Sequence, residues 1–290
     1  MSSPRHQPRW SILKQRLKNL RNDWLLSRYL AHETPDEGPF KASLRDSLGR
    51  LGGQKNLLCI VAFERAEVID LCLSGLKLFL ANAAIAVFDN SRSDKGRALI
   101  AKVCQQRQIP YLTLPPQSTT HANRSHGMAM SWIFGRVIKD LEPDQFGFID
   151  HDLIALGPVD PFAPLKNQPV YGCLNQGKDA WNLWAGYCFY RLSAMQEKEI
   201  NFLYDFSREL DTGGRNWTGL YRFINKGTLV FPSDRIEHYT RLSGVDHPVQ
   251  LIDGHWLHVG GVSYNDNLNI KQSLFQALVA HLNQLENQAR

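Results

Sequence analysis

The sequence predicts an α/β protein with a mainly parallel sheet, helices on both faces of that sheet, and an N-terminal helical extension. Three observations predict this class. Apolar runs of strand length alternate with segments of helical periodicity between Asn56 and Asp152. The chain has 290 residues, 43% of them hydrophobic, which is enough for a sizeable core. A basic segment with helical periodicity precedes the first apolar run.

The extension covers residues 9–30, where basic residues alternate with apolar residues at helical spacing: Trp10, Leu13, Leu17, Leu20, Trp24 and Leu25. One interpretation is a helix that lies on an anionic membrane surface. The other, which the commonness of such helices favours, is that the apolar stripe packs on the protein's own body or on a second subunit. Proline and glycine in residues 31–54 predict a linker, so residues 1–55 are expected to form a helix and a linker.

Strands and helices alternate after the linker. The expected strands are 57–63, 84–88, 110–114 and 146–149, and the expected helices are 66–80, 93–108 and one that ends near 141. In sheets built this way, ligands bind beyond the carboxyl ends of the strands. Asp89 follows the second strand, and Asp150 and Asp152 follow the fourth. We therefore expect the functional site at that edge.

Charge and cysteine content exclude several classes of protein. Residues 1–50 hold ten of the 33 Lys and Arg but five of the 28 Asp and Glu, so the rest of the chain is electrically balanced. A balanced body argues against a nucleic-acid binder. The five cysteines are scattered through apolar runs and are expected to be reduced and buried. No signal peptide or membrane span is recognisable, which predicts a cytoplasmic protein.

The motif with the strongest chemical meaning is Asp150–His151–Asp152, which directly follows an apolar strand. Two carboxylates at one strand end suit Mg²⁺ or Mn²⁺, because these ions prefer oxygen ligands and complete their shell with water and phosphate oxygens. A metal there neutralises the charge of a departing diphosphate. The structural alternative is an Asx turn, in which the Asp side chains cap the backbone.

The segment FGFIDHDLIAL, together with Asp89–Asn90–Ser91 and Ser125–His126–Gly127, resembles the GT-A glycosyltransferases, especially family-2-like bacterial enzymes. The resemblance runs from about residue 56 to residue 261. It implies a GT-A catalytic domain over 56–290 that uses a nucleoside-diphosphate sugar. The nucleotide-binding half would span about 56–155 and the acceptor half about 156–265, followed by a C-terminal helix at about 268–288.

The resemblance also implies roles for individual residues. Phe63 and Arg65 would lie beside the nucleotide base, and Asp89, with the adjacent Asn90, would contact base or ribose. Asp150 would hold the ribose and the metal-bound diphosphate. The metal ligands, for Mn²⁺ or Mg²⁺, would be Asp150, Asp152 and His258.

Two residues of the loop before the third helix are candidates for donor phosphate binding. Arg124 has a guanidinium beside a helix N-terminus, which favours anions, although an arginine in a polar loop is usually only exposed. His126 is also a candidate, but a lone loop histidine is more often solvated or caps a helix.

The acceptor half contributes an aromatic segment and an acidic turn. Residues 182–190 predict an aromatic loop that leads into a strand, where Trp184 and Gly186 would contact the acceptor sugar; a Trp at a strand start is core about as often. Asp211 precedes a glycine pair, in the region where the resemblance places a catalytic base for the acceptor hydroxyl. A simple turn that begins with Asp is an equal alternative.

The leading hypothesis is therefore a metal-dependent glycosyltransferase with a glycan, lipid-linked or other hydroxyl acceptor. A sugar-phosphate nucleotidyltransferase is the second hypothesis, and the absence of a Gly-rich phosphate loop after the first strand speaks against it. The third is a nucleotide-sugar-binding protein that has the fold but no activity. Donor sugar, stereochemistry and oligomeric state depend on features that motif spacing does not encode.

Overall fold

The structure, a computed structural model, describes residues 9–117, 119–238, 242, 248–262 and 271–288, with side chains from residue 13 onward. Two helices come first, and strands and helices then alternate up to β5. The order is α1 (Arg9–Leu30), α2 (Glu37–Gly49), β1 (Asn56–Ala62), α3 (Ala66–Phe79), β2 (Ala84–Asp89), α4 (Asp94–Arg107), β3 (Tyr111–Thr113), α5 (Ala122–Ile133), the π-helical turn η1 (Phe134–Ile138), α6 (Lys139–Leu141), β4 (Gln145–Asp150) and β5 (Leu153–Ala155).

The second half of the chain is richer in strands. Its elements are η2 (Ala163–Lys166), β6 (Val170–Gln176), β7 (Trp181–Arg191), η3 (Leu192–Ala194), α7 (Asn216–Gly219), η4 (Tyr221–Phe223), η5 (Lys226–Thr228), β8 (Asp234–Glu237), β9 (Val249–Ile252), β10 (Trp256–His258) and α9 (Gln272–Gln288). Helix α9 matches the expected C-terminal helix, whose predicted first residues, 268–270, lie outside the described residues.

The main sheet has six strands in the order β3-β2-β1-β4-β7-β6. The first four strands of this order run parallel, and β7 and β6 add antiparallel pairings at the other side. Side chains of β1 alternate between two hydrophobic clusters, one on each face of the sheet. Burial on both faces explains why the predicted strand is a continuous apolar run.

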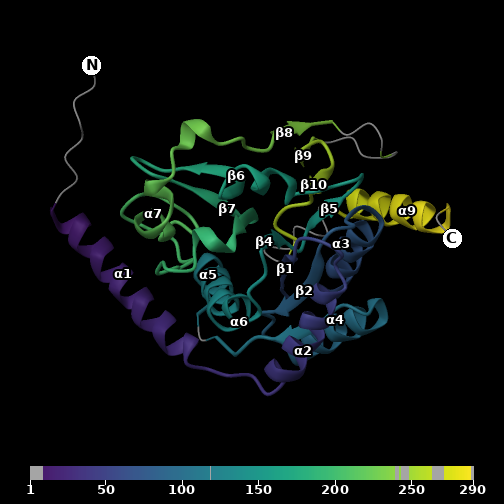
Figure 1. The fold of residues 1–290 in the computed structure, drawn as a ribbon, viewed down its shortest axis with the longest axis horizontal. Coiled ribbons are helices and arrows are strands. Elements are labelled where there is room, and N and C mark those ends of the chain that lie inside the picture. The colour runs from purple at the N-terminus through teal and green to yellow at the C-terminus, as the bar shows by residue number, and fades with distance from the viewer. Residues whose placement is uncertain (1–8, 118, 239–241, 243–247, 263–270, 289–290) are drawn as a thin grey trace.

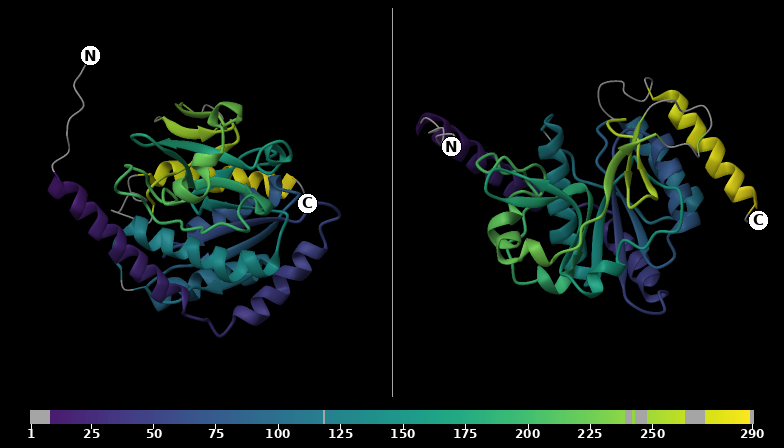
Figure 2. Two further views of the ribbon diagram at one scale, coloured as in Figure 1. Left: turned by 60° about the vertical axis from the view of Figure 1, so that its left-hand side comes forward. Right: turned by 90° about the horizontal axis from the view of Figure 1, so that it is seen from above.

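Helices cover both faces of the main sheet (Figure 1, Figure 2). Helices α2 and α5 share a hydrophobic cluster with one face, and α3, α4 and α9 share the cluster on the other. The predicted class, an α/β fold with a mainly parallel sheet, helices on both faces and an N-terminal helical extension, is confirmed. The five cysteines are free and buried, as expected.

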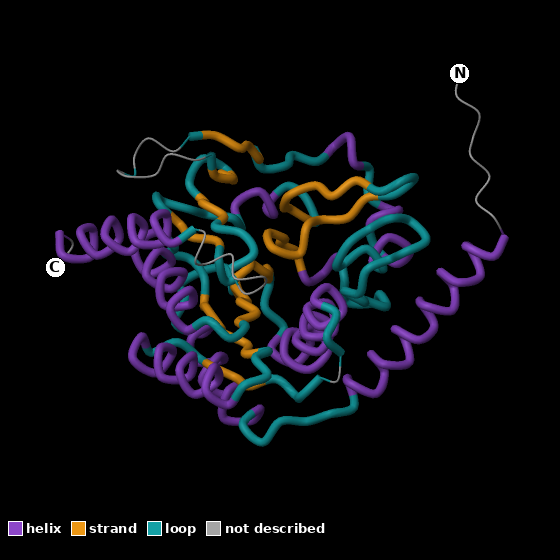
Figure 3. The backbone as a smooth tube through the Cα atoms, turned by 180° about the vertical axis from the view of Figure 1, so that it is seen from behind, coloured by secondary structure: helices purple, strands orange, loops and turns teal. Residues whose placement is uncertain are grey.

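A second sheet of four antiparallel strands has the order β5-β10-β9-β8. Figure 1 labels these strands, and Figure 3 shows the strands in orange from behind. Strand β5 follows β4 after a two-residue turn, so the two sheets are joined at Asp150–His151–Asp152. In this sheet His258 is the register partner of Leu153. The pairing therefore carries a residue from near the end of the chain to the carboxyl edge of the main sheet.

The expected linker at 31–54 is wrong, because α2 forms there and packs into the core. Phe40, Leu44 and Leu48 are buried, and the Phe40 ring contacts the Phe88 ring edge-on with centroids 5.2 Å apart. The prolines and glycines that suggested a linker lie near the ends of α2. The segment is thus part of the body of the protein.

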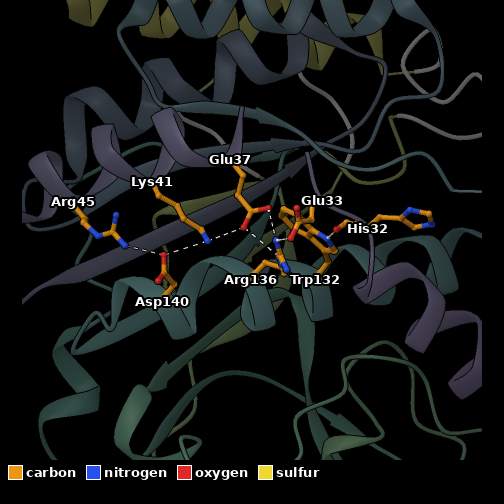
Figure 4. A network of polar contacts seen from close by, with 8 residues as sticks. All are labelled: His32, Glu33, Glu37, Lys41, Arg45, Trp132, Arg136 and Asp140. Atoms are coloured by element: carbon orange, nitrogen blue, oxygen red, sulfur yellow. Dashed lines mark hydrogen bonds and ion pairs between the residues drawn. The ribbon is translucent and has the colours of Figure 1, made fainter. Parts of the chain in front are cut away.

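Polar contacts fix α2 to the helical segment α5–η1–α6 (Figure 4). Glu37 accepts hydrogen bonds from Lys41 and Arg136, Asp140 pairs with Lys41 and Arg45, and the Trp132 indole donates to the backbone carbonyl of His32 at 2.9 Å. Burial raises the pKa of Glu37, but the two cationic partners outweigh it and hold the pKa below its ordinary value. The carboxylate is therefore charged and paired at neutral pH.

Helix α1 docks on the body through the face opposite to its apolar stripe. Asn19, Asn22, Leu26 and Tyr29 are buried. Of the described stripe residues, Leu13, Leu17, Leu20 and Trp24 are exposed and Leu25 is half-buried. The favoured interpretation had two parts: the four exposed residues do not pack on the protein's own body, and packing on a second subunit stays a prediction. Hydrogen bonds and ion pairs between α1 and the body determine which face of α1 is buried. Among the described residues, no helix combines the length and the apolar character needed to cross a membrane.

Candidate active site

A cavity of about 260 Å³ opens at the carboxyl edge of the parallel strands. The end of β1, the start of α5, the β4–β5 turn, β7 and the end of β10 all contribute to its wall. Nine of the residues predicted from sequence line it: Phe63, Asn90, His126, Asp150, Asp152, Trp184, Gly186, Asp211 and His258. The main concentration of predicted side chains thus coincides with a cavity.

Two acids and a histidine lie together at the floor of this cavity. One ligand atom from each of Asp150, Asp152 and His258 can be chosen such that all three lie within 4.8 Å of one another. The His258 Nε2 atom is 3.4 Å from an oxygen of Asp152. Asp150 ends β4, Asp152 precedes β5, and β10 brings His258 beside them through its pairing with β5.

The two carboxyl groups have opposite proton affinities. Burial and the charge of Asp152 raise the pKa of Asp150 to about 6. Burial also raises the pKa of Asp152, but the hydrogen bond and positive charge of His258 outweigh it and hold that pKa well below the ordinary range. Burial lowers the pKa of His258, and the contact with Asp152 more than compensates, so the net direction is upward. Two acidic side chains thus lie close together here, and the His258 imidazole compensates part of their charge.

A chain of hydrogen bonds behind His258 fixes its tautomer. Gln250 donates from Nε2 to Asp234 at 2.8 Å, and a carboxylate can only accept. The Gln250 Oε1 atom therefore faces the His258 ring and accepts from Nδ1–H at 2.6 Å. A neutral imidazole held in this way keeps the Nε2 lone pair directed to the acidic pair, which is the arrangement found at metal-binding histidines.

Replacing Gln250 with leucine tests this support. The Gln250→Leu variant loses the acceptor for Nδ1–H, so we expect its affinity for Mn²⁺ to fall by about 10- to 100-fold. Gln250→Glu keeps an acceptor oxygen at the same place and is expected to retain most of the affinity. Isothermal titration with Mn²⁺ measures both variants against the natural protein. Equal Mn²⁺ affinity of the leucine variant and the natural protein would show that the contact does not orient a ligand.

His126 lies near the start of α5, one turn into the helix, with its Nε2 atom buried and 4.0 Å from an oxygen of Asp150. This nitrogen has no hydrogen-bond partner among the described residues, and the side chain lines the cavity. Burial lowers the pKa of His126 to about 4, against the opposing charges of Asp211 and Asp152. The residue is thus a neutral imidazole at neutral pH, with one nitrogen free for a ligand.

Trp184 and Gly186 are not on a loop, as the sequence suggested, but on the long strand β7. The Trp184 ring lies against the His258 ring, with centroids 4.9 Å apart. A Cβ at position 186 would be 2.2 Å from the Trp184 ring and 2.5 Å from an oxygen of Asp150. Only glycine therefore lets β7 pass so close to this carboxyl group.

Asp211 belongs to a turn, as one alternative from sequence predicted, and it also lines the cavity; its role as a base stays a prediction. Its Oδ1 atom accepts hydrogen bonds from the Thr212 backbone amide at 2.7 Å and from the Asn123 side chain. The carboxyl group is otherwise exposed to the cavity. An anchored but accessible carboxylate is suited to accept a proton from a bound hydroxyl group.

Three predicted site residues lie outside the cavity lining. Asp89 is fully buried and accepts from the Ser91 amide at 2.8 Å and from the Tyr111 hydroxyl at 2.7 Å, so the predicted contact with base or ribose is not supported. Arg65 pairs with Glu67 at 3.6 Å on the surface.

The guanidinium of Arg124, the third of these residues, donates hydrogen bonds to neighbouring segments of the protein. It donates to Asn22 of α1 at 2.8 Å, to Thr119 at 3.0 Å and to Tyr204 at 3.1 Å. These contacts use three of the five N–H groups of the guanidinium, and Arg124 is not part of the cavity lining, so the predicted phosphate contact is not supported. Its position between α1 and the loops explains why the side chain is held.

Sequence reasoning missed Gln250, Asn123 and Thr212. A signal for Gln250 was present, because Asp253–Gly254 between two short apolar segments is typical of a hairpin turn. That hairpin makes Gln250 the register partner of His258. The contacts of Asn123 and Thr212 depend on two loops that are distant in sequence, and no local pattern marks them.

The chemistry of the donor set fits a divalent cation. Two carboxylates and one imidazole match Mn²⁺ or Mg²⁺ with open positions for water and phosphate oxygens, and Mn²⁺ tolerates the nitrogen ligand better. The raised pKa of Asp150 comes first from burial and then from the charge of Asp152, and a bound cation would favour the ionised form of this carboxyl group.

No protein-family model matches this sequence, and no match to a curated protein was found. Among solved structures, the chain is similar to the galactosyltransferase LgtC in complex with donor and acceptor sugar analogs, at 14% identity and a TM-score of 0.36 over 49% of this chain and 60% of LgtC. It is similar to TarS of S. aureus at 13% identity and a TM-score of 0.37, over 51% of this chain and 30% of TarS.

A third similar structure is the mannosyltransferase PcManGT from Pyrobaculum calidifontis in complex with GDP-Man and Mn²⁺. Its identity is 10% and its TM-score 0.37, over 63% of this chain and 55% of PcManGT. The chain thus covers less than two thirds of each of these proteins. Because the likenesses are partial and distant, we derive the function below from the chain's own residues.

Proposed function

We propose that this protein is a metal-dependent glycosyltransferase that moves a sugar from a nucleoside-diphosphate donor to a hydroxyl group of a glycan or lipid-linked acceptor. The observation that carries the proposal is the meeting of Asp150, Asp152 and His258 within 4.8 Å at the carboxyl edge of a parallel sheet, inside a cavity. Residues 56–155 provide the donor side and residues 156–265 the acceptor side.

Asp150 and Asp152 of the donor side, together with His258 from the acceptor half of the chain, would hold Mn²⁺ or Mg²⁺, which when bound neutralises the diphosphate. Phe63 and Asn90 line the same cavity just after the ends of β1 and β2, and in this proposal they contact the base and ribose. His126 adds an uncharged imidazole beside Asp150. A neutral group there interacts with phosphate oxygens without competing with the cation.

On the acceptor side, Asp211 is the proposed base. Its carboxylate accepts the proton of the acceptor hydroxyl as that oxygen bonds to the anomeric carbon, and the bond from that carbon to the diphosphate oxygen breaks. The electron pair of the broken bond leaves with the nucleoside diphosphate. Trp184 offers a partly exposed ring in the same cavity as a surface for the acceptor sugar.

A thermal-shift experiment tests the proposal. We expect UDP or GDP to raise Tm in the presence of Mn²⁺, by the amount that corresponds to about 2.7 kcal/mol when the nucleotide is at 100 times its Kd. Excess EDTA should abolish this increase, because the diphosphate is then left opposite two carboxylates. Equal shifts with Mn²⁺ and with EDTA would refute a metal-bridged diphosphate.

The thermal shift with nucleotide and Mn²⁺ is also expected to depend on pH, because two of the proposed metal ligands change protonation state. The pKa of His258 is raised and that of Asp150 is about 6, so both residues bind protons as the pH falls toward 6 and below. Each proton must leave before the metal binds. The Mn²⁺-dependent shift is therefore expected to increase as the pH rises and to decline as the pH falls through 6.

A further inference from the structure

The outer face of α1 is an apolar stripe that no described part of the body covers. Leu13, Leu17, Leu20 and Trp24 are 47%, 57%, 64% and 56% exposed. At 3.6 residues per turn these four positions fall within about 60° of one another around the helix axis. Single exposed apolar residues are ordinary, but an aligned row of four on one helix indicates a surface that binds something.

The helix cannot turn this stripe inward, because its other face is fixed. Asn22 accepts from Arg124 at 2.8 Å, Asp23 pairs with Arg215, and the Tyr29 hydroxyl donates to the Pro115 carbonyl at 3.3 Å. Asn19 and Leu26 are buried on the same side. The exposed stripe is therefore a settled feature of the docked helix.

Positive charge borders the stripe on both sides. Lys14, Arg21 and Arg28 follow one edge and Arg16 the other, and all four are exposed. The Arg28 guanidinium lies 5.0 Å from the centre of the Trp24 ring. The only acidic residue between positions 13 and 30 is Asp23, which faces Arg215 on the body. The outward face of α1 is thus apolar along its centre and cationic along its edges.

We propose that α1 docks the protein on an anionic lipid bilayer, with the helix axis parallel to the membrane plane. The stripe would enter the boundary between headgroups and acyl chains, and the flanking cations would reach lipid phosphates. Charge decides between this occupant and a second copy of the chain. Two copies that paired their stripes would bring like-charged edges together, whereas an anionic surface is complementary to them.

The docked helix is also connected to the acceptor side of the cavity. Asn22 contacts Arg124, which directly follows the cavity residue Asn123. Asp23 contacts Arg215, which lies four positions after the cavity residue Asp211. If the proposed function is correct, on which this step rests, the arrangement favours a lipid-linked acceptor. The membrane contact itself does not depend on the reaction.

Vesicle sedimentation of the full chain, without donor or metal, tests the contact. We expect partition onto phosphatidylglycerol-containing vesicles, weak partition onto pure phosphatidylcholine, and a decrease at high salt. The variant Leu17→Gln/Leu20→Gln/Trp24→Gln should partition at least about tenfold less, because these side chains contact no core. A matched control, Phe223→Gln/Val230→Gln/Ile236→Gln, changes residues that are 65%, 67% and 76% exposed elsewhere and should partition like the natural protein.

Two results would overturn the proposal. One is equal partition of the stripe variant and the natural protein onto anionic vesicles. The other is no partition of the natural protein, together with a dimer in sedimentation velocity that the stripe variant loses, which would assign the stripe to a second copy. Because no donor, acceptor or metal is present, these outcomes are separate from failure of the proposed reaction.

Discussion

The Asp152→Asn variant is expected to lose Mn²⁺-dependent sugar transfer almost completely, with kcat/KM lower by about 10²- to 10³-fold or more. Asp152 is the more strongly ionised acid of the pair, because the contact with His258 holds its pKa low. Asparagine has nearly the same shape but removes one negative charge from the proposed ligand set. Since loss of an outer partner alone costs about 10- to 100-fold in metal affinity, loss of a direct ligand should cost more.

Two measurements separate this effect from misfolding. Isothermal titration reports Mn²⁺ binding directly, and far-UV circular dichroism reports the fold. Asp179→Asn is the matched control, because Asp179 is an exposed acid in the β6–β7 loop outside the cavity lining. Unchanged Mn²⁺ affinity in Asp152→Asn, with the fold intact, would remove this residue from the metal site.

The Asp211→Asn variant is expected to separate catalysis from binding. Loss of a general base lowers rates by about 10²- to 10⁴-fold, so kcat for transfer should fall within that range. Asparagine keeps the Oδ1 acceptor for the Thr212 amide, so the turn should persist. Mn²⁺ and nucleoside-diphosphate affinities should stay within about threefold of the natural values, because Asp211 is not among the proposed ligands.

The comparison of kcat with nucleotide affinity decides this case. A variant that transfers sugar at a rate similar to that of the natural protein would exclude Asp211 as the base. An Asn123→Ala variant gives a second measurement, because it removes the side-chain donor to Asp211 and leaves the carboxylate itself. A smaller loss than in Asp211→Asn is expected, since the base is then less well oriented but present.

Much of the parallel half of the fold was predictable, because local and tertiary forces agree there. The apolar runs that form β1 and β4 are buried on both faces, and the segments between them have helical periodicity. At most of the strand ends, the boundary predicted from these patterns differs from the observed boundary by one residue. The acidic pair and His258 were also predicted, although the approach of His258 came from a resemblance and not from a local pattern.

The remainder depends on partners that sequence does not identify. The apolar periodicity of α1 marks the exposed face, because Asn22 and Asp23 dock the helix through arginines of distant segments. Asp89 lies at a strand end, where a ligand-binding acid is expected, but its carboxylate accepts a hydrogen bond from the Tyr111 hydroxyl of the neighbouring strand. The second sheet consists of strands of three or four residues, which are too short for a clear alternation.

The pairing of β10 with β5 has a consequence for biosynthesis. A nascent chain on the ribosome that has exposed the whole donor side still lacks His258, whose strand is paired last in chain order. The proposed cation site is thus incomplete until β10 has emerged and paired with β5. A translation product that stops after the aspartate pair would therefore lack one of the three proposed ligands.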